Sequence, residues 1–381
     1  MVPFAFIGPG HPLAERVKRL RAAIATRHPA PGATVHADLT LREDDGAGLV
    51  LHRAYWSAQA DGPDGFAATT LSYNATRDRA QWLAFPEDPE LPAMARIDGP
   101  PYRGVLRYMP LRRCTMLSFI EQRTATPMIV KFKRPHRLAA SWALLKAVHA
   151  ALGDGRAGFD VPAPLGLDPP VACSGQTVLG GADLSTIADA DLLRRAGALH
   201  RAMHAADVPG LPPEDPAQAL AELRADARWV AFALPEHADA VRAVMAVLEP
   251  RTPRAPRVPA FCHGDLVPSQ MLYGERWAIT DFDGARTGDP HRDLAIWLAS
   301  LTSDVPALGA AAEAGDDAAV AQAEGAYLDG YGAHDEARLL WHRGAAEVHY
   351  AAVALKKDRY HPARLARGLR LARVCAETLE R

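Results

Sequence analysis

The chain contains little cysteine and no long apolar run, and both absences narrow what it can be. Its four cysteines, Cys114, Cys173, Cys262 and Cys375, are too far apart for a paired zinc or redox motif. A reducing, cytoplasmic setting is therefore expected. No stretch approaches the roughly 18 uninterrupted apolar residues of a membrane helix. No basic segment precedes the first apolar residues either, so we expect neither a membrane partner nor a signal peptide.

The chain also lacks an excess of positive charge. Its 43 Lys and Arg residues face 45 Asp and Glu residues, which gives a formal net charge of -2 at pH 7. Nucleic-acid-binding proteins usually show a basic excess or a clustered basic face, so the totals predict no nucleic-acid partner. Hydrophobic residues make up 49% of the 381 positions, which is ample for a packed core in two or three domains.

The order of apolar patterns predicts an α+β protein. Residues 11–26 have helical spacing, and alternating runs between residues 33 and 75 are typical of strands. A proline-rich stretch at 85–94 indicates a boundary, after which a second β-rich block precedes a helix over 136–153. The chain is mostly helical from about residue 189. We therefore expect two lobes, a β-rich one at 96–180 and a helical one at 181–381, after an additional N-terminal α/β segment at 1–95.

The stretch FCHGDLVPSQMLYGERWAITDFDGARTGDPHRDLA, from Phe261 to Ala295, contains five aspartates. Its short apolar runs suit a β-hairpin with Asp265 and Asp281 in loops at its edges. Carboxylates gathered there would raise one another's pKa unless a cation lay between them. Magnesium, which proteins bind with one or two carboxylates and substrate phosphates, is the simplest such cation. A single aspartate in a turn would need no such explanation, because Asp bonds its own backbone there.

The same stretch resembles the signature of the aminoglycoside phosphotransferase and choline kinase-like superfamily. The resemblance lies in HGD, four residues, a polar amide, a strand ending in Asp-Phe-Asp, and GDPxxDLA. Weaker similarity is found in GALHRAMH, VLGGADL and MIVKFKR, so that residues 100 to 380 are covered. The resemblance implies a bilobal protein-kinase-like fold with a β-rich N-lobe and a mostly helical C-lobe. It also implies an ATP- and Mg²⁺-dependent kinase that phosphorylates a hydroxyl group of a small molecule.

The resemblance assigns a role to each matching residue. Asp265 would orient the acceptor hydroxyl and accept its proton. Gln270 and Asp281 would hold the metal, and Asp283 would be a further metal ligand or, less favoured, a local cap. The nucleotide would be bound through Lys131 and Arg113 at the phosphates and through the segment of Val178 and Gly180 at the adenine. His263 would fix the catalytic loop, and Asp293 would cap the following helix and tie back to that loop.

Three departures weaken the resemblance and keep a second hypothesis open, a nucleotide-binding pseudokinase with a regulatory or scaffolding role. Gln270 stands where the family has Asn, one methylene shorter. The helix after Lys131 contains no acidic residue to pair with it. The turn before residue 114 has no glycine, and its Arg112 and Arg113 are either a phosphate grip or a solvated basic hairpin. A metal-dependent hydrolase is a third hypothesis.

Other features leave alternatives open. His200 and His204 have a spacing that could suit zinc, but no third ligand is evident, and core or surface histidines are favoured. Acidic residues between 313 and 336 could line a site for a cationic aminoglycoside or only solvate helices. A sugar, an amino alcohol or a peptide hydroxyl is equally open as the acceptor. The role of residues 1–95 is not determined, and a homodimer is possible.

Overall fold

The computed structural model describes residues 3–26, 32–44, 48–62, 64–96, 104–120 and 126–381. They divide into two compact units. The first consists of Met1–Trp142, Pro164–Val178 and Val353–Tyr360. The second consists of Ala143–Ala163, Leu179–Ala352 and His361–Arg381.

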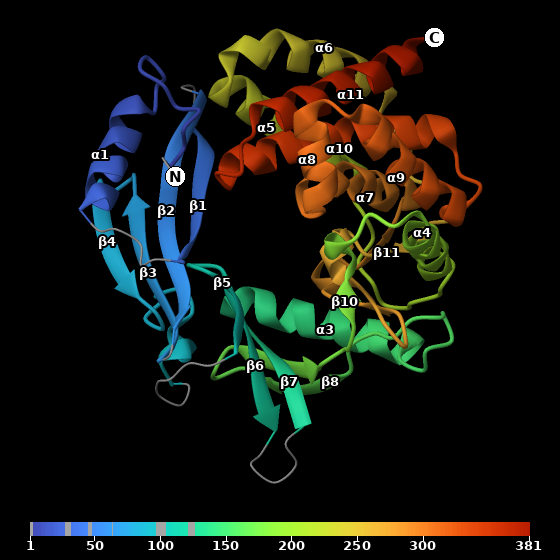
Figure 1. Ribbon diagram of the computed structural model, residues 1–381, viewed down its shortest axis with the longest axis horizontal. Helices are drawn as coiled ribbons and strands as arrows, with labels where there is room; N and C mark the ends of the chain where they lie inside the picture. Colours follow the sequence, from blue (N-terminus) through green and yellow to red (C-terminus); the bar gives the residue numbers. More distant parts are fainter. Residues whose placement is uncertain (1–2, 27–31, 45–47, 63, 97–103, 121–125) are drawn as a thin grey trace. The chain divides into compact units, whose positions relative to one another are not determined.

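An antiparallel four-stranded sheet and helix α1 begin the first unit (Figure 1). The elements are α1 (Ala14–Ala25), β1 (Thr34–Asp44), β2 (Gly48–Gly62), β3 (Gly65–Asn74) and β4 (Arg79–Ala84). Helix α1 buries Val17, Leu20 and Ile24 at helical spacing, as its sequence predicts. The additional N-terminal α/β segment expected from the sequence is therefore present.

The two faces of this sheet differ in polarity. Apolar residues such as Leu39, Trp56 and Leu71 alternate along the strands with polar ones. On the other face Ser57 and Thr70 are buried, and their hydroxyls are 2.9 Å apart. The Gln59 amide donates to the backbone oxygen of Tyr108, so this polar face is directed towards the next sheet in the chain.

The second sheet of the first unit has five antiparallel strands in the order β5-β6-β7-β9-β8. Its elements are β5 (Val105–Met109), β6 (Arg113–Ile120), β7 (Thr126–Lys133), β8 (Pro164–Asp168) and β9 (Cys173–Thr177). Helix α3 (Pro135–Leu152) connects β7 to β8. This is the β-rich block that the sequence predicts.

The second unit is mainly helical. Its helices are α4 (Ala190–His204), α5 (Pro216–Ala233), α6 (Ala238–Leu248), α7 (Pro290–Asp304), α8 (Pro306–Ala314), α9 (Asp317–Tyr331), α10 (Glu336–Lys356, whose last residues belong to the first unit) and α11 (Pro362–Glu380). Trp297 and Tyr327 lie in its core with stacked rings 4.8 Å apart. The predicted α+β class, with a β-rich N-terminal part and a helical C-terminal part, is thus confirmed.

No single helix among the described residues is long and apolar enough to span a membrane. The pair α7 and α8 passes on length and composition when taken together, but it is bent by 79°.

Helices α4 and α9 approach each other closely because glycines lie where they meet. A Cβ atom on Gly197 would be 2.1 Å from the backbone oxygen of Tyr327, and one on Gly330 would be 1.8 Å from that of Arg194. Real Cβ atoms do not come so close to backbone. The close packing of these two helices therefore depends on the missing side chains.

We predict that Gly197→Ala lowers the free energy of unfolding by about 1–3 kcal/mol, because the added methyl group forces α4 away from α9. Gly325→Ala on α9 is the matched control, since its Cβ would meet nothing within 4 Å. That change should be neutral or stabilising by about 0.5–1 kcal/mol through helix propensity. Urea unfolding of both variants makes the comparison, and equal effects would contradict the close-packing argument.

Candidate active site

Short strands of the second unit hold the aspartate-rich stretch. Strand β11 (Ala260–Cys262) pairs with β14 (Arg286–Gly288), and β12 (Met271–Tyr273) forms a hairpin with β13 (Ala278–Ile279). Strand β10 (Ala182–Asp183) adds to β12. The apolar runs QMLY (270–273) and WAIT (277–280) thus form the predicted hairpin. The run AFC (260–262) pairs instead with β14, which follows the hairpin in the chain.

The loops that contain Asp265 and Asp281 are in contact. A Cβ atom on Gly264 would be 2.3 Å from the backbone oxygen of Gly284, and Gly264 has φ +86°. Only glycine satisfies both conditions without strain. Asp281 also has a left-handed backbone, with φ 67° and ψ 47°, which Asp tolerates better than most residues. The backbone therefore fixes where each carboxylate is attached.

His263 and Asp293 supply the side-chain bonds that hold these loops. The backbone N–H groups of His263 and Gly264 donate to the two oxygens of Asp293 at 2.5 and 3.0 Å. The Nε2 atom of His263 lies 2.9 Å from the backbone oxygen of Thr280, the residue before Asp281. One carboxylate and one imidazole thus tie the start of the first loop to α7 and to the start of the second loop.

The prediction that Asp293 caps α7 is wrong. The N-cap residue is Asp289, whose carboxylate accepts from the backbone N–H of His291. Asp293 lies in the first turn, where it faces the loop instead. Burial alone would raise the pKa of Asp289, but hydrogen bonds from His291, His342 and Arg338 hold that pKa well below its ordinary value.

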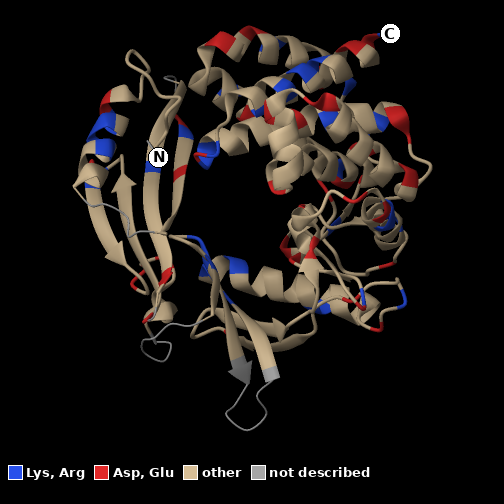
Figure 2. Cartoon of the chain, in the orientation of Figure 1, with Lys and Arg blue, Asp and Glu red and all other residues tan. Residues whose placement is uncertain are grey.

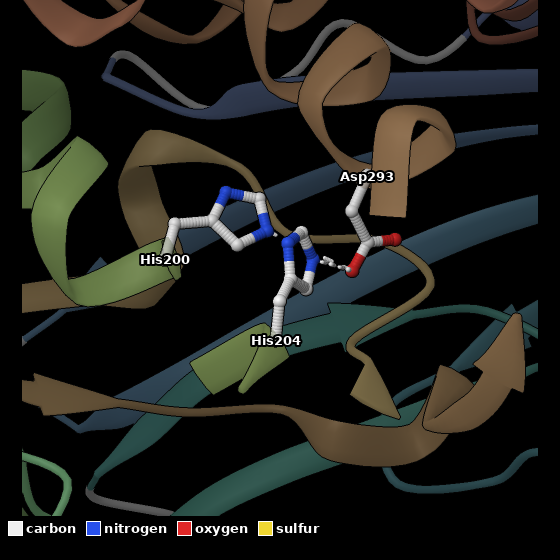
Figure 3. A group of neighbouring side chains, drawn as sticks. All are labelled: His200, His204 and Asp293. Atoms are coloured by element: carbon white, nitrogen blue, oxygen red, sulfur yellow. Dashed lines mark ion pairs between the residues drawn. The ribbon is translucent and has the colours of Figure 1, made fainter. Parts of the chain in front are cut away.

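Two histidines of α4 complete the surroundings of Asp293 (Figure 3). The Nε2 atoms of His200 and His204 lie 3.8 and 3.5 Å from the same carboxylate oxygen. Their Nδ1 atoms face the hydroxyls of Tyr327 and Tyr331 on α9, the second at 3.0 Å. The sequence analysis found no third ligand for this pair, and the structure brings Asp293 to it. The histidines are core residues, as that analysis favoured.

The pKa values of His200 and Asp293 in this buried cluster are both lowered, for different reasons. Burial, together with His204, lowers the pKa of His200 to about 3, so this imidazole is neutral. Burial would raise the pKa of Asp293, but the nearby Nε2 groups of both histidines hold it well below its ordinary value. Asp293 is therefore an anion in the core, and both of its oxygens already accept backbone N–H groups. Each oxygen keeps a second lone pair, and the ligand atoms of His200, His204 and Asp293 lie within 4.8 Å of one another, which is the spacing of a metal site.

The predicted metal ligands Gln270, Asp281 and Asp283 lie in or next to the two loops that contain Asp265 and Asp281. The side-chain oxygen of Gln270 accepts from the backbone N–H of Val267 at 3.1 Å. Its backbone oxygen accepts from the N–H of Thr280 at 3.0 Å, which connects it to the Asp281 loop. Gln270 is thus positioned near Asp281, but its amide oxygen has one lone pair committed to its own turn.

The predicted nucleotide residues are divided between the units. Lys131 lies on β7 opposite Thr115 and Ser174, and Arg113 lies on β6 opposite Lys133. Val178 is exposed at the end of the first unit, and Gly180 is exposed at the start of the second. Lys131, Arg113 and Val178 therefore belong to the first unit, and Gly180 belongs to the second.

Lys133 was missed by the sequence analysis. It is buried, and its ammonium group donates to the hydroxyl of Ser141 on α3, the helix that lacks an acid. Lys131 and Lys133 are two residues apart on β7, so they share one face of the strand, and this spacing could have drawn attention to Lys133.

Tyr350 of α10 was missed as well. Burial raises the pKa of its phenol, and the nearby charge of Asp265 raises it further.

Comparison with known proteins identifies the family. Residues 118–342, more than half of the chain, match the family described as APH, the phosphotransferase enzyme family. The chain therefore belongs to this phosphotransferase family, as the resemblance implied. A search of curated proteins found no match.

Three solved structures with a similar backbone are named as kinases or phosphotransferases. Choline kinase LicA from Streptococcus pneumoniae is 14% identical, with 72% of this chain and 92% of that one covered at a TM-score of 0.49. A thermostable mutant of aminoglycoside phosphotransferase APH(4)-Ia, in complex with ADP and hygromycin B, is 13% identical with the same coverage and TM-score. Amicoumacin kinase hAmiN, with AMP-PNP, Ca²⁺ and Ami, is 13% identical, with 72% and 88% covered at a TM-score of 0.48.

The neutral state of His200 predicts a pH dependence of stability. The unfolded chain protonates this histidine below its ordinary pKa of 6.5, whereas the folded chain does so only near pH 3. The unfolded state therefore binds more protons between these values, and stability falls as the pH decreases through that window. The slope contributed is up to about 1.4 kcal/mol per pH unit.

We predict that His200→Gln flattens the dependence of the free energy of unfolding on pH between 6.5 and 4.5. The exposed His136 provides the control variant His136→Gln. Urea unfolding at several pH values measures both slopes. An unchanged slope for His200→Gln would show that this imidazole binds protons equally in the folded and unfolded states.

Proposed function

We propose that this protein is an ATP- and Mg²⁺-dependent kinase that transfers the γ-phosphate to a hydroxyl group of a small molecule. Membership of the phosphotransferase family supports the reaction class. The observation that carries the finer proposal is the junction of the two aspartate loops through Gly264, His263 and Asp293. Phosphoryl transfer needs positioning and charge stabilisation more than covalent chemistry, and this junction supplies rigid positioning.

Asp265 would accept the proton of the acceptor hydroxyl while that oxygen forms a bond to the γ-phosphorus and the bond to the β-phosphate oxygen breaks. Its exposed position suits contact with a substrate. Asp293 and His263 would hold its loop in place during this step. Tyr350, whose phenol stays neutral, would lie beside the carboxylate and offer a hydrogen-bond donor.

The donors near Asp281 suit magnesium. Asp281, Asp283 and Gln270 offer carboxylate and amide oxygens, the hard ligands that Mg²⁺ prefers together with substrate phosphates. When bound, the ion would neutralise charge that develops on the phosphates. Lys131 and Arg113 would bind phosphate oxygens from the first unit, with Val178 and Gly180 at the adenine.

The acidic residues of the helical unit do not indicate a positively charged acceptor. Glu313, Asp317 and Glu324 pair with Arg364, Arg367 and Arg343 respectively. Asp316 caps α9, and Asp335 accepts from the backbone N–H of Arg338. Because these carboxylates have partners within the chain, we propose a hydroxyl-bearing small molecule without requiring a cationic one.

Two observations favour the pseudokinase alternative. The amide oxygen of Gln270 is turned to the backbone of Val267, and α3 contains no acid that could pair with Lys131. Both features would weaken the hold on a metal–nucleotide complex. A protein that binds ATP and Mg²⁺ without turnover would fit them.

The catalytic assignment predicts that Asp265→Asn lowers kcat by about 10²–10⁴-fold, the usual contribution of a general base. Nucleotide affinity should remain, because the loop backbone is held by Asp293. ADP release with ATP, Mg²⁺ and a panel of hydroxyl acceptors is the measurement, and Asp239→Asn, at an exposed position of α6, is the control. Binding of ATP without ADP release by the unaltered protein would support the pseudokinase instead.

The same assay distinguishes the roles of the two lysines of β7. If Lys131 binds the phosphates, Lys131→Met should raise KM for ATP about tenfold or more, as expected from losing a charged hydrogen bond. Lys133→Met, which removes the bond to Ser141, should affect mainly stability. A larger effect on KM from Lys133→Met, in a variant that remains folded, would move the phosphate role to Lys133.

A further inference from the structure

One buried carboxylate of the second unit is paired with histidines instead of arginine. Lys, Arg, Asp and Glu positions are spread over the helices of this unit (Figure 2), and a partly buried acid such as Glu324 pairs with Arg343. Asp293 is fully buried, and among the described residues its ion-pair partners are His200 and His204 alone. Two backbone N–H groups bond to it but do not neutralise it. The local charge balance therefore favours a cation.

The two histidines present their Nε2 atoms to Asp293 (Figure 3). They are four residues apart on α4, a spacing at which two helical histidines can bind one zinc ion. Their Nε2 atoms lie 3.8 and 3.5 Å from the same carboxylate oxygen, and the ligand atoms of all three residues lie within 4.8 Å of one another. Three metal-binding side chains thus converge in the core.

The Nε2 atoms of His200 and His204 are buried, and neither forms a hydrogen bond within the described part of the chain. Buried polar atoms nearly always have a hydrogen-bond partner. An N–H···O bond is about 2.7–3.2 Å long, and both separations from Asp293 exceed that length. Two orphaned nitrogens aimed at one carboxylate therefore point to a ligand between them.

The other ring nitrogens contact tyrosines of α9. The Nδ1 atom of His204 lies 3.0 Å from the hydroxyl of Tyr331, and that of His200 contacts the hydroxyl of Tyr327. Histidines that bind a metal usually donate their other N–H to an oxygen, which fixes the orientation of the ring. With the proton on Nδ1, each Nε2 directs a lone pair at the carboxylate. Such groups repel each other unless a cation lies between them.

We propose that His200, His204 and Asp293 bind a Zn²⁺ ion in the core of the second unit. Zinc–ligand bonds of about 2.0–2.2 Å in a tetrahedral site place the ligand atoms roughly 3.3–3.5 Å apart. The separations of 3.5 and 3.8 Å need only a small contraction to reach that geometry. Each oxygen of Asp293 accepts one backbone N–H and keeps a lone pair for the metal. Three protein ligands leave a fourth position for water.

The imidazole ligands distinguish this site from the candidate magnesium site. Mg²⁺ prefers oxygen ligands, whereas Zn²⁺ binds imidazole and carboxylate together. The zinc ion would join α4 to α7 and, through Asp293, to the backbone of His263 and Gly264. It would stabilise this part of the fold without taking part in phosphoryl transfer. The proposal rests on contacts of three side chains and does not depend on the kinase assignment.

Metal analysis of the full chain tests the proposal. Because the three ligands are buried, the ion is expected to enter during folding, so the untagged protein is produced in medium supplemented with Zn²⁺. It is then dialysed against excess Mg²⁺ and AMP-PNP, which occupy the nucleotide site. We expect roughly one Zn²⁺ ion per chain by mass spectrometry. Removal of the ion with EDTA should lower Tm, because an ion that binds only the folded state stabilises it.

Two histidine variants separate this site from surface binding. His204→Gln removes one ligand and keeps a polar side chain, and it should weaken zinc affinity about 100-fold or more, since even the loss of a partner of a ligand costs 10–100-fold. His136→Gln removes an exposed histidine and should keep the zinc. Zinc-free unaltered protein, zinc displaced by Mg²⁺ and AMP-PNP, or equal zinc content in both variants would each overturn the proposal. ADP release by a zinc-free protein would leave the kinase assignment intact.

Cobalt gives a second readout if His204→Gln does not fold. The unaltered protein is produced with Co²⁺ in place of Zn²⁺, and its visible spectrum is measured. Tetrahedral Co²⁺ absorbs visible light strongly, whereas Co²⁺ with six ligands, as in water or at surface carboxylates, absorbs weakly. A strong visible band that survives dialysis supports the buried site. Weak absorption alone, or no bound cobalt, overturns it.

Discussion

The carboxylate of Asp293 is the interaction on which the candidate active site depends. It is buried in the helical unit and accepts the backbone N–H groups of His263 and Gly264, directly before Asp265. A buried charge is costly unless hydrogen bonds compensate it. Here the compensation comes from the loop itself and from two histidines of α4. The loop and the charge therefore stabilise each other, and neither arrangement is favourable alone.

This dependence extends outward through the packing of α4 and α9. The histidines near Asp293 face Tyr327 and Tyr331 of α9, and the two helices approach closely at Gly197 and Gly330. Two glycines thus help to set the surroundings of the candidate catalytic loop. Packed cores respond to changes of a single methyl group, so this chain of contacts is expected to be rigid.

Charge is used differently in the two units. The polar face of the first sheet contains the ion pair of Arg112 with the buried Asp38 and the hydroxyl pair of Ser57 and Thr70. In the helical unit Glu313, Asp317 and Glu324 each pair with an arginine. The overall charge of the chain shows none of these local arrangements, because a total averages over all of its surfaces.

Local patterns allowed much of the fold to be predicted. The helical spacing of Val17 and Leu20, the alternation in β1 to β3 and the hairpin of β12 and β13 each depend on neighbouring residues, and all are present. The capping of α7 was assigned to the wrong aspartate. Asp289 and Asp293 both stand near the helix start, and only the position of the loop decides which one caps the helix.

The sequence by itself determined the α+β order, the family motif and the residue types able to bind phosphate and magnesium, because these follow from short-range pattern and side-chain chemistry. Tertiary structure alone decided that Asp293 meets His200 and His204 and that Arg112 pairs with Asp38. Those contacts join residues distant in the chain. They exist only where packing brings separate elements together, which no local pattern encodes.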